Sequence, residues 1–331
     1  MATTSHAGGR GISRRARHAP DAFEASITSA KAPLSVVIPT RDRQQLLRQA
    51  LKSVMAQTGV PTRLQLIIAD NGLLPGVVEI AEEYGAEYVA TGAVGPGAVR
   101  NAGLRLALGD YVAFLDDDDA WTLEHLSSHL AVLERDRSLG ATVSRMTIGD
   151  ANARPSGREG APAKAPVGLD LFALFLSYFP SVCSVVARRG AVAALGGFDE
   201  RLIHGEDWDW NLRLALQNRV GFVNRTTFVM RSRDPQSDYD CQVRWIRLGY
   251  FQRVFWKHVL RAGDRRPPLR DLADIYRRQS GLFAIWLCAC AQHNLEAGNR
   301  REFAVRLAQA LVASPPHTVA WWGRRWLKHG A

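Results

Sequence analysis

The chain has 331 residues, of which 47% are hydrophobic and 22% are charged. This length is enough for one large α/β domain with an appendage, or for two modest domains. The composition is that of a globular protein, and it excludes wholesale disorder, collagen-like repeats and a polytopic membrane protein. No stretch approaches the roughly 18–20 apolar residues of a membrane-spanning helix, and the N-terminus lacks the apolar core of a secretion signal. The four cysteines include no Cys-x-x-Cys pair, so we expect a protein of the reducing cytoplasm.

The net charge of +10 is concentrated at the two ends of the chain. Residues 1–33 hold five Lys and Arg against two acids, and residues 251–331 hold fourteen against five. The central residues, 34–250, hold 23 basic against 25 acidic side chains. A nucleic-acid-binding protein is expected to carry basic residues over its main domain, so we expect no nucleic-acid partner. A slightly acidic centre instead suits a domain that holds a metal ion.

The first half of the chain predicts a disordered tail followed by an α/β domain. Residues 1–33 are rich in Ala, Gly, Ser and Arg and show no sustained periodicity, which is typical of disorder. After them, apolar runs typical of buried strands alternate with segments of helical spacing. The expected strands are 34–38, 64–69, 86–91 and 111–115, and the expected helices are 42–57, 77–84 and 97–108. This order predicts an open sheet with helices on both faces.

The second half continues the domain and ends in a helical region. Residues 151–168 are rich in Pro, Gly and Ala and indicate a linker or surface loop. Further expected elements are a helix at 169–179, a strand at 183–187, a helix at 207–217, a strand at 221–230 and a polar loop at 232–240. Everything from residue 242 onward has helical character, so we expect the α/β domain to cover 34–240 and a helical extension to cover 241–331.

The role of the C-terminal extension is open at this point. Residues 242–261 and 320–328 combine aromatic and basic side chains. Such stretches lie on anionic membrane surfaces, bind an acceptor, or pack as ordinary core and dimer contacts. The expected partners therefore include a peripheral contact with the inner face of the membrane and a second copy of the chain.

Four successive aspartates, Asp116, Asp117, Asp118 and Asp119, follow the strand at 111–115. In open parallel sheets ligands bind at the carboxyl ends of the strands. The four carboxylates repel one another unless water or a cation neutralises them, and oxygen ligands suit Mg²⁺ or Mn²⁺. In an extended segment Asp116 and Asp118 point the same way, so these two can converge on one ion. The alternative is an exposed acidic turn that caps the next helix.

Other polar residues are expected at the same edge of the sheet. Pro39, Thr40 and Arg41 follow the first strand, and Asp70 follows the second. Asp70 can accept a hydrogen bond from a nucleobase, or it can simply begin an Asp-Asn-Gly turn. Arg100 lies in the first turns of the helix at 97–108 and can serve a base or a diphosphate, although a surface arginine is the alternative.

Glu206 and Asp207 fall at a helix N-terminus, because Gly205 interrupts the chain and the apolar periodicity resumes at Trp210. Carboxylates at this position interact favourably with the helix dipole, which is a purely structural explanation. The same position holds a carboxylate rigidly where a general base must accept a proton from an incoming hydroxyl.

Taken together, four segments resemble glycosyltransferase family 2, the inverting enzymes of GT-A fold that use nucleotide-diphosphate sugars. The segments are LSVVIPTRDR, IIADNG, GAVRNAGLRLALGDYVAFLDDDD and GGFDERLIHGEDWDWNLRL. The resemblance covers residues 33–233 and implies a Rossmann-like open mixed sheet with helices on both faces. It also implies metal-dependent transfer of a sugar, with inversion, to a hydroxyl of a saccharide, a lipid-linked molecule or a small natural product.

The resemblance assigns one group of residues to the nucleotide-sugar donor. Those that would hold the base are Pro39, Thr40, Arg41 and Asp70, and Arg100 would hold the base or the diphosphate.

A second group would carry the chemistry. Asp116 and Asp117 would meet the ribose and the region of the diphosphate and the metal. Asp118 would be the main ligand of a Mg²⁺ or Mn²⁺ ion, together with Asp116. Asp207 would be the catalytic base, with Glu206 beside it.

The chain departs from the family pattern after the last strand, where family members often have a histidine. Here Arg231 and Arg233 are the candidates for diphosphate contacts. Trp208 and Asp209 are the candidates for acceptor contacts, because aromatic faces suit sugars and flat rings. The Gln-Val-Arg-Trp string at 242–245 is one residue short of the Gln-x-x-Arg-Trp of processive synthases, so we expect a non-processive enzyme.

Two alternatives have the same fold or a related one. One is a protein that binds sugars or nucleotide sugars without turnover, which hydrolysis of a panel of nucleotide sugars would distinguish from an enzyme. The other is a sugar nucleotidyltransferase, which would be expected to carry a glycine-rich loop after the first strand; the PTRDR segment has no glycine.

Overall fold

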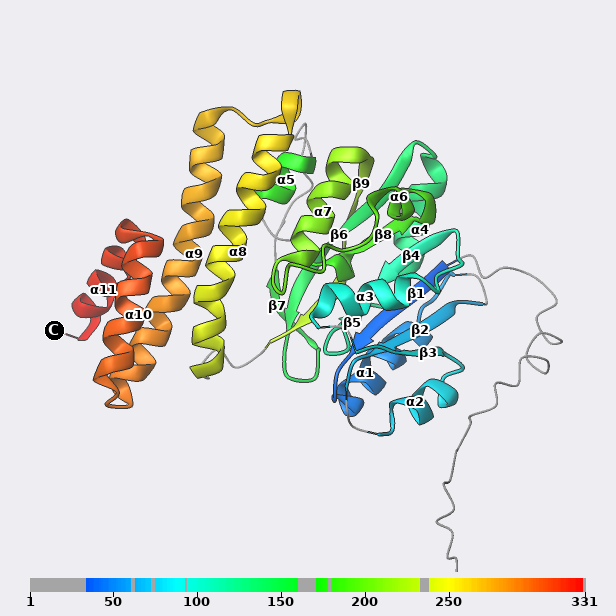
Figure 1. The fold of residues 1–331 in the computed structure, drawn as a ribbon, viewed down its shortest axis with the longest axis horizontal. Coiled ribbons are helices and arrows are strands. Elements are labelled where there is room, and N and C mark those ends of the chain that lie inside the picture. Colours follow the sequence, from blue (N-terminus) through cyan, green and yellow to red (C-terminus); the bar gives the residue numbers. More distant parts are fainter. Residues whose placement is uncertain are drawn as a thin grey trace, which may run out of the picture. The chain divides into compact units, whose positions relative to one another are not determined.

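The computed structural model (Figure 1) describes residues 34–60, 63–72, 75–92, 94–159, 171–177, 180–232 and 238–329. The described residues belong to one compact unit. The tail expected at 1–33, part of the segment expected as a linker or loop at 151–168, and Arg233 lie outside the described residues.

One half of the sheet is parallel. Its strands are, in spatial order, β3 (Glu87–Ala90), β2 (Gln65–Asp70), β1 (Leu34–Thr40) and β4 (Tyr111–Phe114). The helices that connect them are α1 (Gln44–Met55), α2 (Val77–Glu83) and α3 (Pro96–Leu104). Every residue of β1 is buried, as expected of a parallel strand covered on both faces. The predicted order of strands and helices is confirmed here.

A glycine brings α3 close to this half of the sheet. A β-carbon on Gly103 would lie 2.5 Å from Cγ1 of Val37 in β1. A larger residue would therefore push the helix away from the strand. The close contact fixes the position of Arg100, about one helical turn earlier in α3.

The other half makes the sheet mixed. It continues with β8 (Val185–Arg188), β6 (Leu139–Gly149), β9 (Arg219–Arg231) and β5 (Ala120–Trp121). β8 is antiparallel to both neighbours, whereas β6 and β9 are parallel. The helices of this half are α4 (His125–Arg135), α5 (Leu171–Ser177), α6 (Arg189–Leu195) and α7 (Glu206–Gln217).

The expectation of a loop or linker from residue 151 is wrong for residues 155–159, which form strand β7 (Pro155–Glu159). β8 pairs only with residues 141–143 of β6, and β7 pairs with residues 147–149 farther along. Without β7, residues 147–149 of β6 would have backbone N–H and C=O groups without a strand partner on the edge that faces β8 at residues 141–143. β7 supplies this partner.

The C-terminal region is helical, as expected. It comprises α8 (Asp238–Arg261), α9 (Leu269–Glu296), α10 (Arg300–Ala313) and α11 (Pro315–His329), drawn from yellow to red in Figure 1. α8 packs against α7, where the ring of Phe251 stacks on the ring of Trp208 with 5.3 Å between the ring centres. Among the described residues, no helix combines the length and the apolar character needed to cross a membrane.

Candidate active site

The carboxyl ends of β1, β2 and β4 meet at one edge of the sheet, as the sequence predicts. Thr40, the last residue of β1, is opposite Asp70, the last residue of β2. Phe114 at the end of β4 is opposite Val37 of β1. The chain then passes through Leu115, whose N–H donates to the carbonyl of Val37, and enters the four aspartates. The predicted donor residues Thr40 and Asp70 therefore lie at the edge where the acidic segment begins.

The four aspartates form a turn and not an extended segment. The N–H of Asp119 donates to the carbonyl of Asp116 at 3.1 Å. The alternation expected for an extended backbone, with Asp116 and Asp118 facing the same way, therefore does not apply. Carboxylate oxygens of Asp116 and Asp119, together with Sγ of Cys183, lie within 4.8 Å of one another.

The two central carboxylates of the turn face Arg43. Its guanidinium lies 2.8 Å from Asp117 and 2.9 Å from Asp118. The hydroxyl of Thr40 donates to Asp117 at 2.7 Å, which ties the end of β1 to the turn. Burial raises the pKa of Asp117 to about 7, although Arg43 and Thr40 act in the opposite direction.

Arg100 connects the aspartate turn to α7. Its side chain is only 4% exposed and donates to Asp116 at 2.6 Å and to Glu206 at 2.8 Å. The guanidinium carbon also lies 5.6 Å from the centre of the Phe198 ring. Two acidic motifs that are about ninety residues apart in the sequence thus share one buried cation. The structure brings together Arg100, Asp116 and Glu206 as the sequence analysis expects for one site.

Glu206 and Asp207 occupy the first turn of α7, which follows Gly205 at φ +75°. Burial raises the pKa of Glu206, and the neighbouring charge of Asp207 adds to this, while Arg100 lowers it. Desolvation also raises the pKa of Asp207; Arg100 opposes this effect and the charge of Asp116 adds to it. Oδ1 of Asp207 accepts a hydrogen bond from the N–H of Trp208. A carboxylate with a raised pKa is a stronger base than an ordinary one.

Asp70 begins a turn whose shape depends on Gly72. Its carboxylate accepts hydrogen bonds from the N–H of Gly72 at 2.7 Å and from the hydroxyl of Tyr88 at 3.2 Å. A β-carbon on Gly72 would lie 2.6 Å from a carboxylate oxygen of Asp42 and 2.9 Å from its backbone nitrogen. The loops after β1 and β2 therefore touch, and Arg41, whose side chain is 71% exposed, lies beside this contact.

The side-chain atoms that the turn offers as metal ligands fit a divalent cation. Carboxylate oxygens are hard ligands of the kind that Mg²⁺ and Mn²⁺ prefer. The cluster contains Asp116, as expected, and Asp119 in the place where the sequence analysis expects Asp118. Cys183 is a soft donor and its sulfur accepts a hydrogen bond from the N–H of Asp116 at 3.2 Å. It fits better as a support of the turn than as a ligand.

Arg231 supports the aspartate turn from β9. Its Nε donates to the carbonyl of Asp118 at 2.6 Å, and its backbone N–H donates to Asp119 at 2.9 Å. The same guanidinium donates to Gln49 and to the carbonyl of Ala151. Arg231 is 8% exposed, so the structure gives it the role of holding the turn, and the expected diphosphate contact stays a prediction.

Trp208 and Asp209, the expected acceptor contacts, are both buried among protein partners, so the structure gives them packing roles, and a contact with the acceptor stays a prediction. The indole of Trp208 donates to the carbonyl of Phe175 at 2.7 Å. Asp209 is fully buried and forms ion pairs with Arg213 at 2.8 Å and Lys257 at 2.6 Å. It also lies 2.8 Å from Nε2 of His258. Since the cations come from α7 and α8, Asp209 joins these helices.

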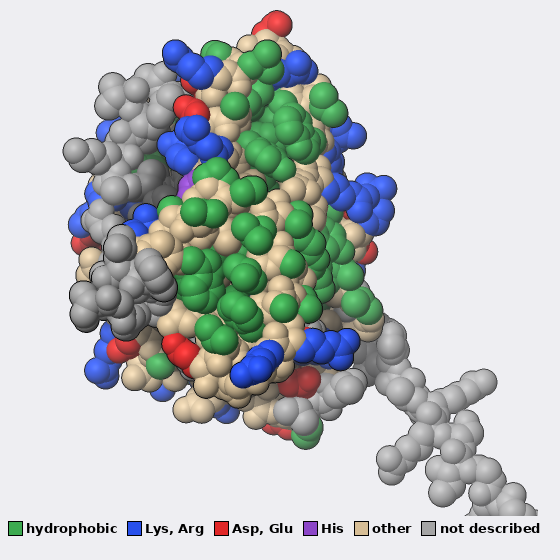
Figure 2. Space-filling view, turned by 90° about the vertical axis from the view of Figure 1, so that its left-hand side faces the viewer, with side chains coloured by type: hydrophobic (Ala, Val, Ile, Leu, Met, Phe, Trp, Pro, Cys, Tyr) green, Lys and Arg blue, Asp and Glu red, His purple; other side chains and the backbone are tan. Residues whose placement is uncertain are grey.

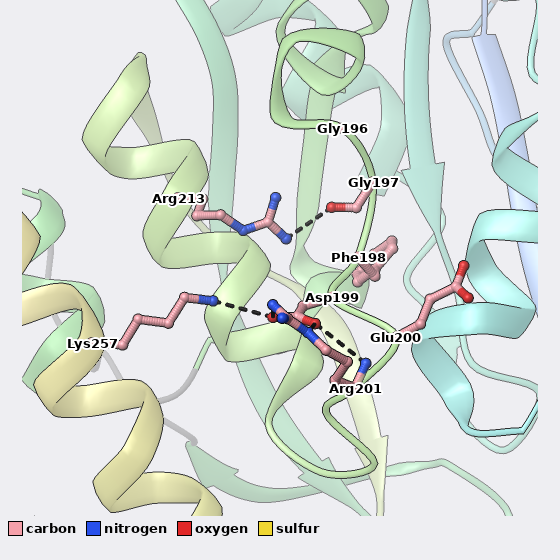
Figure 3. A pocket seen from close by; sticks show the side chains of 8 residues that line it. All are labelled: Gly196, Gly197, Phe198, Asp199, Glu200, Arg201, Arg213 and Lys257. Carbon is pink, nitrogen blue, oxygen red and sulfur yellow. Dashed lines mark hydrogen bonds and ion pairs between the residues drawn. The ribbon is translucent and has the colours of Figure 1, made fainter.

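A pocket of about 430 Å³ lies beside this junction (Figure 3). Its lining is Gly196, Gly197, Phe198, Asp199, Glu200, Arg201, Arg213 and Lys257, and includes none of the predicted donor or metal residues. Figure 3 shows its cations turned toward protein oxygens. Arg213 donates to the carbonyl of Gly197, and Lys257 and Arg201 pair with Asp199. The pocket therefore presents mostly neutralised charges.

Several contacts in this region were not predicted from the sequence. They involve Arg43, Tyr88, Asp119 and Cys183, together with Asn101, whose side chain donates to the carbonyl of Phe198 and accepts from its N–H. Arg43 and Asp119 follow strand ends by only a few residues, which was an available signal. Tyr88 and Cys183 lie inside strands or short helical turns and carry no local sign of their position.

The comparisons with known proteins point to one family of enzymes. The model of the family described as "Glycosyl transferase family 2" matches residues 35–195. The uncharacterized glycosyltransferase YwdF of Bacillus subtilis is 27% identical over 240 residues, which cover 69% of this chain and 84% of YwdF. The pre-mycofactocin glycosyltransferase of Mycobacterium tuberculosis is 31% identical over 194 residues, which cover 55% of this chain and 38% of that protein. An uncharacterized Rickettsia conorii glycosyltransferase is covered over only 32% of its length.

Solved structures share the fold at low sequence identity. Staphylococcus aureus TarS 1–349 in complex with UDP-GlcNAc has a TM-score of 0.51 at 16% identity, covering 84% of this chain and 91% of that chain. The mannosyltransferase PcManGT from Pyrobaculum calidifontis, in complex with GDP-Man and Mn²⁺, has a TM-score of 0.52 at 17% identity. The match covers 91% of this chain and 83% of PcManGT.

Proposed function

This chain belongs to glycosyltransferase family 2 and has the GT-A type of α/β fold, and from this premise we propose that it is a metal-dependent, inverting, non-processive transferase. It moves a sugar from a nucleotide-diphosphate sugar to a hydroxyl of an acceptor. The observation that carries the proposal is the position of Arg100, which contacts both the aspartate turn and Glu206. Donor site and base site therefore meet at one guanidinium.

The donor site lies at the carboxyl ends of β1, β2 and β4. In the proposal, the residues that hold the nucleotide are Pro39, Thr40, Arg41, Asp70, Arg100, Asp116 and Asp117. Two solved structures of the same fold contain UDP-GlcNAc or GDP-Man, which supports a nucleotide-sugar donor and leaves its base and sugar to experiment.

The metal would be held by Asp116, with Asp119 as a ligand whose carboxylate lies close to it in the same turn. The expected ligand Asp118 pairs with Arg43 in this structure and would have to leave that partner to reach the ion. A divalent ion supplies positive charge that stabilises the negative charge developing on the leaving diphosphate. Arg100 adds a second, fixed positive charge at this point. A preorganised charge of this kind is usually a large part of catalysis.

Asp207 accepts the proton of the acceptor hydroxyl in the proposed mechanism. The hydroxyl attacks the anomeric carbon from the face opposite the diphosphate, the bond to the diphosphate breaks, and the proton moves to Asp207. A single displacement inverts the configuration at that carbon. Glu206, held by Arg100, keeps the first turn of α7 in place, and burial together with the charge of Asp207 raises the pKa of Glu206.

The proposal is tested with a panel of UDP-, GDP- and dTDP-sugars, by thermal shift and by release of the nucleotide in the presence of Mn²⁺. We expect one class of donor to stabilise the protein in Mn²⁺ and not in EDTA. Asp207→Asn serves as the matched variant: it should retain the thermal shift and lose turnover by about 10²–10⁴-fold, the usual contribution of a general base.

Three results would contradict the proposal. Activity in EDTA equal to that in Mn²⁺ would show that the reaction does not need a metal ion. Unchanged turnover in folded Asp207→Asn would remove this base. Donor binding without any turnover, with acceptors of every class tested, would support a binding protein of the same fold.

A further inference from the structure

The stretch from the end of the first turn of α10 to the middle of α11 presents a surface that is poor in charged side chains. Between Phe303 and Gly323 the only Lys, Arg, Asp or Glu in the sequence is Arg306. Arg306 is 5% exposed and donates to Glu302 and Gln309, so its charge is neutralised within α10. An uncharged surface is unexpected here, because residues 251–331 hold fourteen basic against five acidic side chains.

Apolar side chains occupy this uncharged surface. The most exposed large ones are Val305 at 40%, Leu311 at 41%, Val312 at 73% and Val319 at 67%. Exposed small apolar residues lie among them in the sequence, namely Ala304, Ala308, Pro315, Pro316 and Ala320. Figure 2 faces this side of the molecule and shows hydrophobic side chains spread over it. Soluble monomers rarely expose large contiguous patches of this kind, so the face indicates a binding surface.

Basic residues flank the apolar residues. Arg300 and Arg301 are exposed at the start of α10, and Arg324 is exposed in α11. In Figure 2, Lys and Arg side chains stand at the margins of the apolar surface and outnumber the acidic ones. An apolar face with basic flanks complements an anionic lipid surface. A twofold contact between two copies would instead place like-charged margins next to each other.

We propose that the face formed by the outer surfaces of α10 and α11 docks peripherally on an anionic lipid bilayer. The valines and Leu311 enter the boundary between head groups and acyl chains, and the flanking arginines contact the anionic head groups. Trp321 and Trp322, both partly buried near the end of this surface, are of the residue type that favours the membrane interface. The docking is independent of the proposed donor site, because none of that site's residues belongs to these helices.

The test is flotation of the full chain, without nucleotide, with vesicles of phosphatidylcholine alone or with about 30% phosphatidylglycerol. We expect binding to the anionic vesicles to exceed binding to the neutral ones by about tenfold and to weaken as salt is raised. Since no donor or acceptor is present, a failed transferase assay and a failed flotation assay are separate results.

Three variants identify the surface. Val312→Asp and Val319→Asp place a charge on the exposed face and should each reduce binding by about tenfold, because an apolar contact is lost and a like charge is added. Val78→Asp is the matched control: Val78 is 43% exposed in the first turn of α2, away from this surface, and the change should leave binding unchanged. Unfolding temperatures establish that all three variants are folded.

Three results would overturn the proposal. One is failure of the intact chain to float with anionic vesicles at low salt. Another is an equal loss of vesicle binding in Val78→Asp and Val312→Asp. The third is a dimer in light scattering that Val312→Asp dissociates, which would assign the face to a second copy of the chain.

Discussion

The guanidinium of Arg100 is surrounded by carboxylates from two distant parts of the sequence. Asp116 follows β4 and Glu206 begins α7, and each accepts a hydrogen bond from a different nitrogen of Arg100. The position of Arg100 in the first turns of a helix predicts a contact with a base or a diphosphate, and this role stays a prediction. The contact of Arg100 with Glu206 was not predictable, because the two residues are 106 positions apart and no local pattern relates them.

The acid limit of the reaction depends on the raised pKa values of Glu206 and Asp207. An ordinary carboxyl titrates near pH 4, and desolvation raises the pKa of both groups above their ordinary values. A base must be deprotonated to act. As the pH is lowered, turnover should therefore begin to fall before the pH reaches the value of about 4 at which an ordinary carboxyl titrates. A pH profile of turnover at saturating donor measures this limit.

Glu206→Gln provides the control for this prediction. It removes one negative charge from the coupled pair, which should lower the pKa of Asp207 and move the acid limit to lower pH. An acid limit near pH 4 in the unaltered protein, or one that Glu206→Gln leaves in place, would contradict the prediction.

At the scale of elements, Asp209 fastens α7 to α8. The spacing of apolar residues predicted α7 correctly, but it did not predict that Trp208 and Asp209, the expected acceptor contacts, are buried. An acidic residue next to two tryptophans is typical of a sugar-binding surface, and the sequence around it contains no sign of Lys257 or His258, which lie 48 and 49 positions later. Burial of this carboxylate depends on a helix whose packing was not predictable.

Asp209→Asn should destabilise the protein and leave the donor-binding residues in place. Removing one member of a buried charge network typically costs about 3–5 kcal/mol, because the partner charges stay buried without compensation. Chemical denaturation of both proteins at pH 7 measures the difference. A difference below about 0.5 kcal/mol, the size usual for surface changes, would contradict this role.

The same residue gives stability a dependence on pH. Burial alone would raise the pKa of Asp209, but His258, Lys257 and the charge of Arg213 outweigh this effect and lower it. A carboxyl with a lowered pKa in the folded state stabilises the protein above its unfolded pKa of about 4 and loses this contribution as the pH falls below that value. The free energy of unfolding should therefore drop more steeply below pH 4 in the unaltered protein than in Asp209→Asn.

At the scale of the whole molecule, the sequence predicted the parallel half of the sheet better than the rest. Buried apolar runs such as β1 and β4 are recognisable by themselves, and the rule for strand ends then brought Thr40, Asp70 and Asp116 to one edge. β6 and β7 were not assigned, because the first mixes polar and apolar residues and the second forms only through pairing with β6. A turn at the aspartates was the stated alternative to an extended segment, but it was expected to be exposed; its burial was not predictable, since it depends on contacts with Arg43 and Arg231.

Anomalous scattering from crystals soaked with Mn²⁺ and UDP or GDP would reveal whether the aspartate turn holds a divalent ion against the diphosphate of the donor. We expect a manganese peak about 2–2.5 Å from a carboxylate oxygen of Asp116, and at similar distance from Asp118 or Asp119 and a phosphate oxygen. A bound nucleotide with no manganese at this turn, or with manganese held elsewhere, would contradict this expectation.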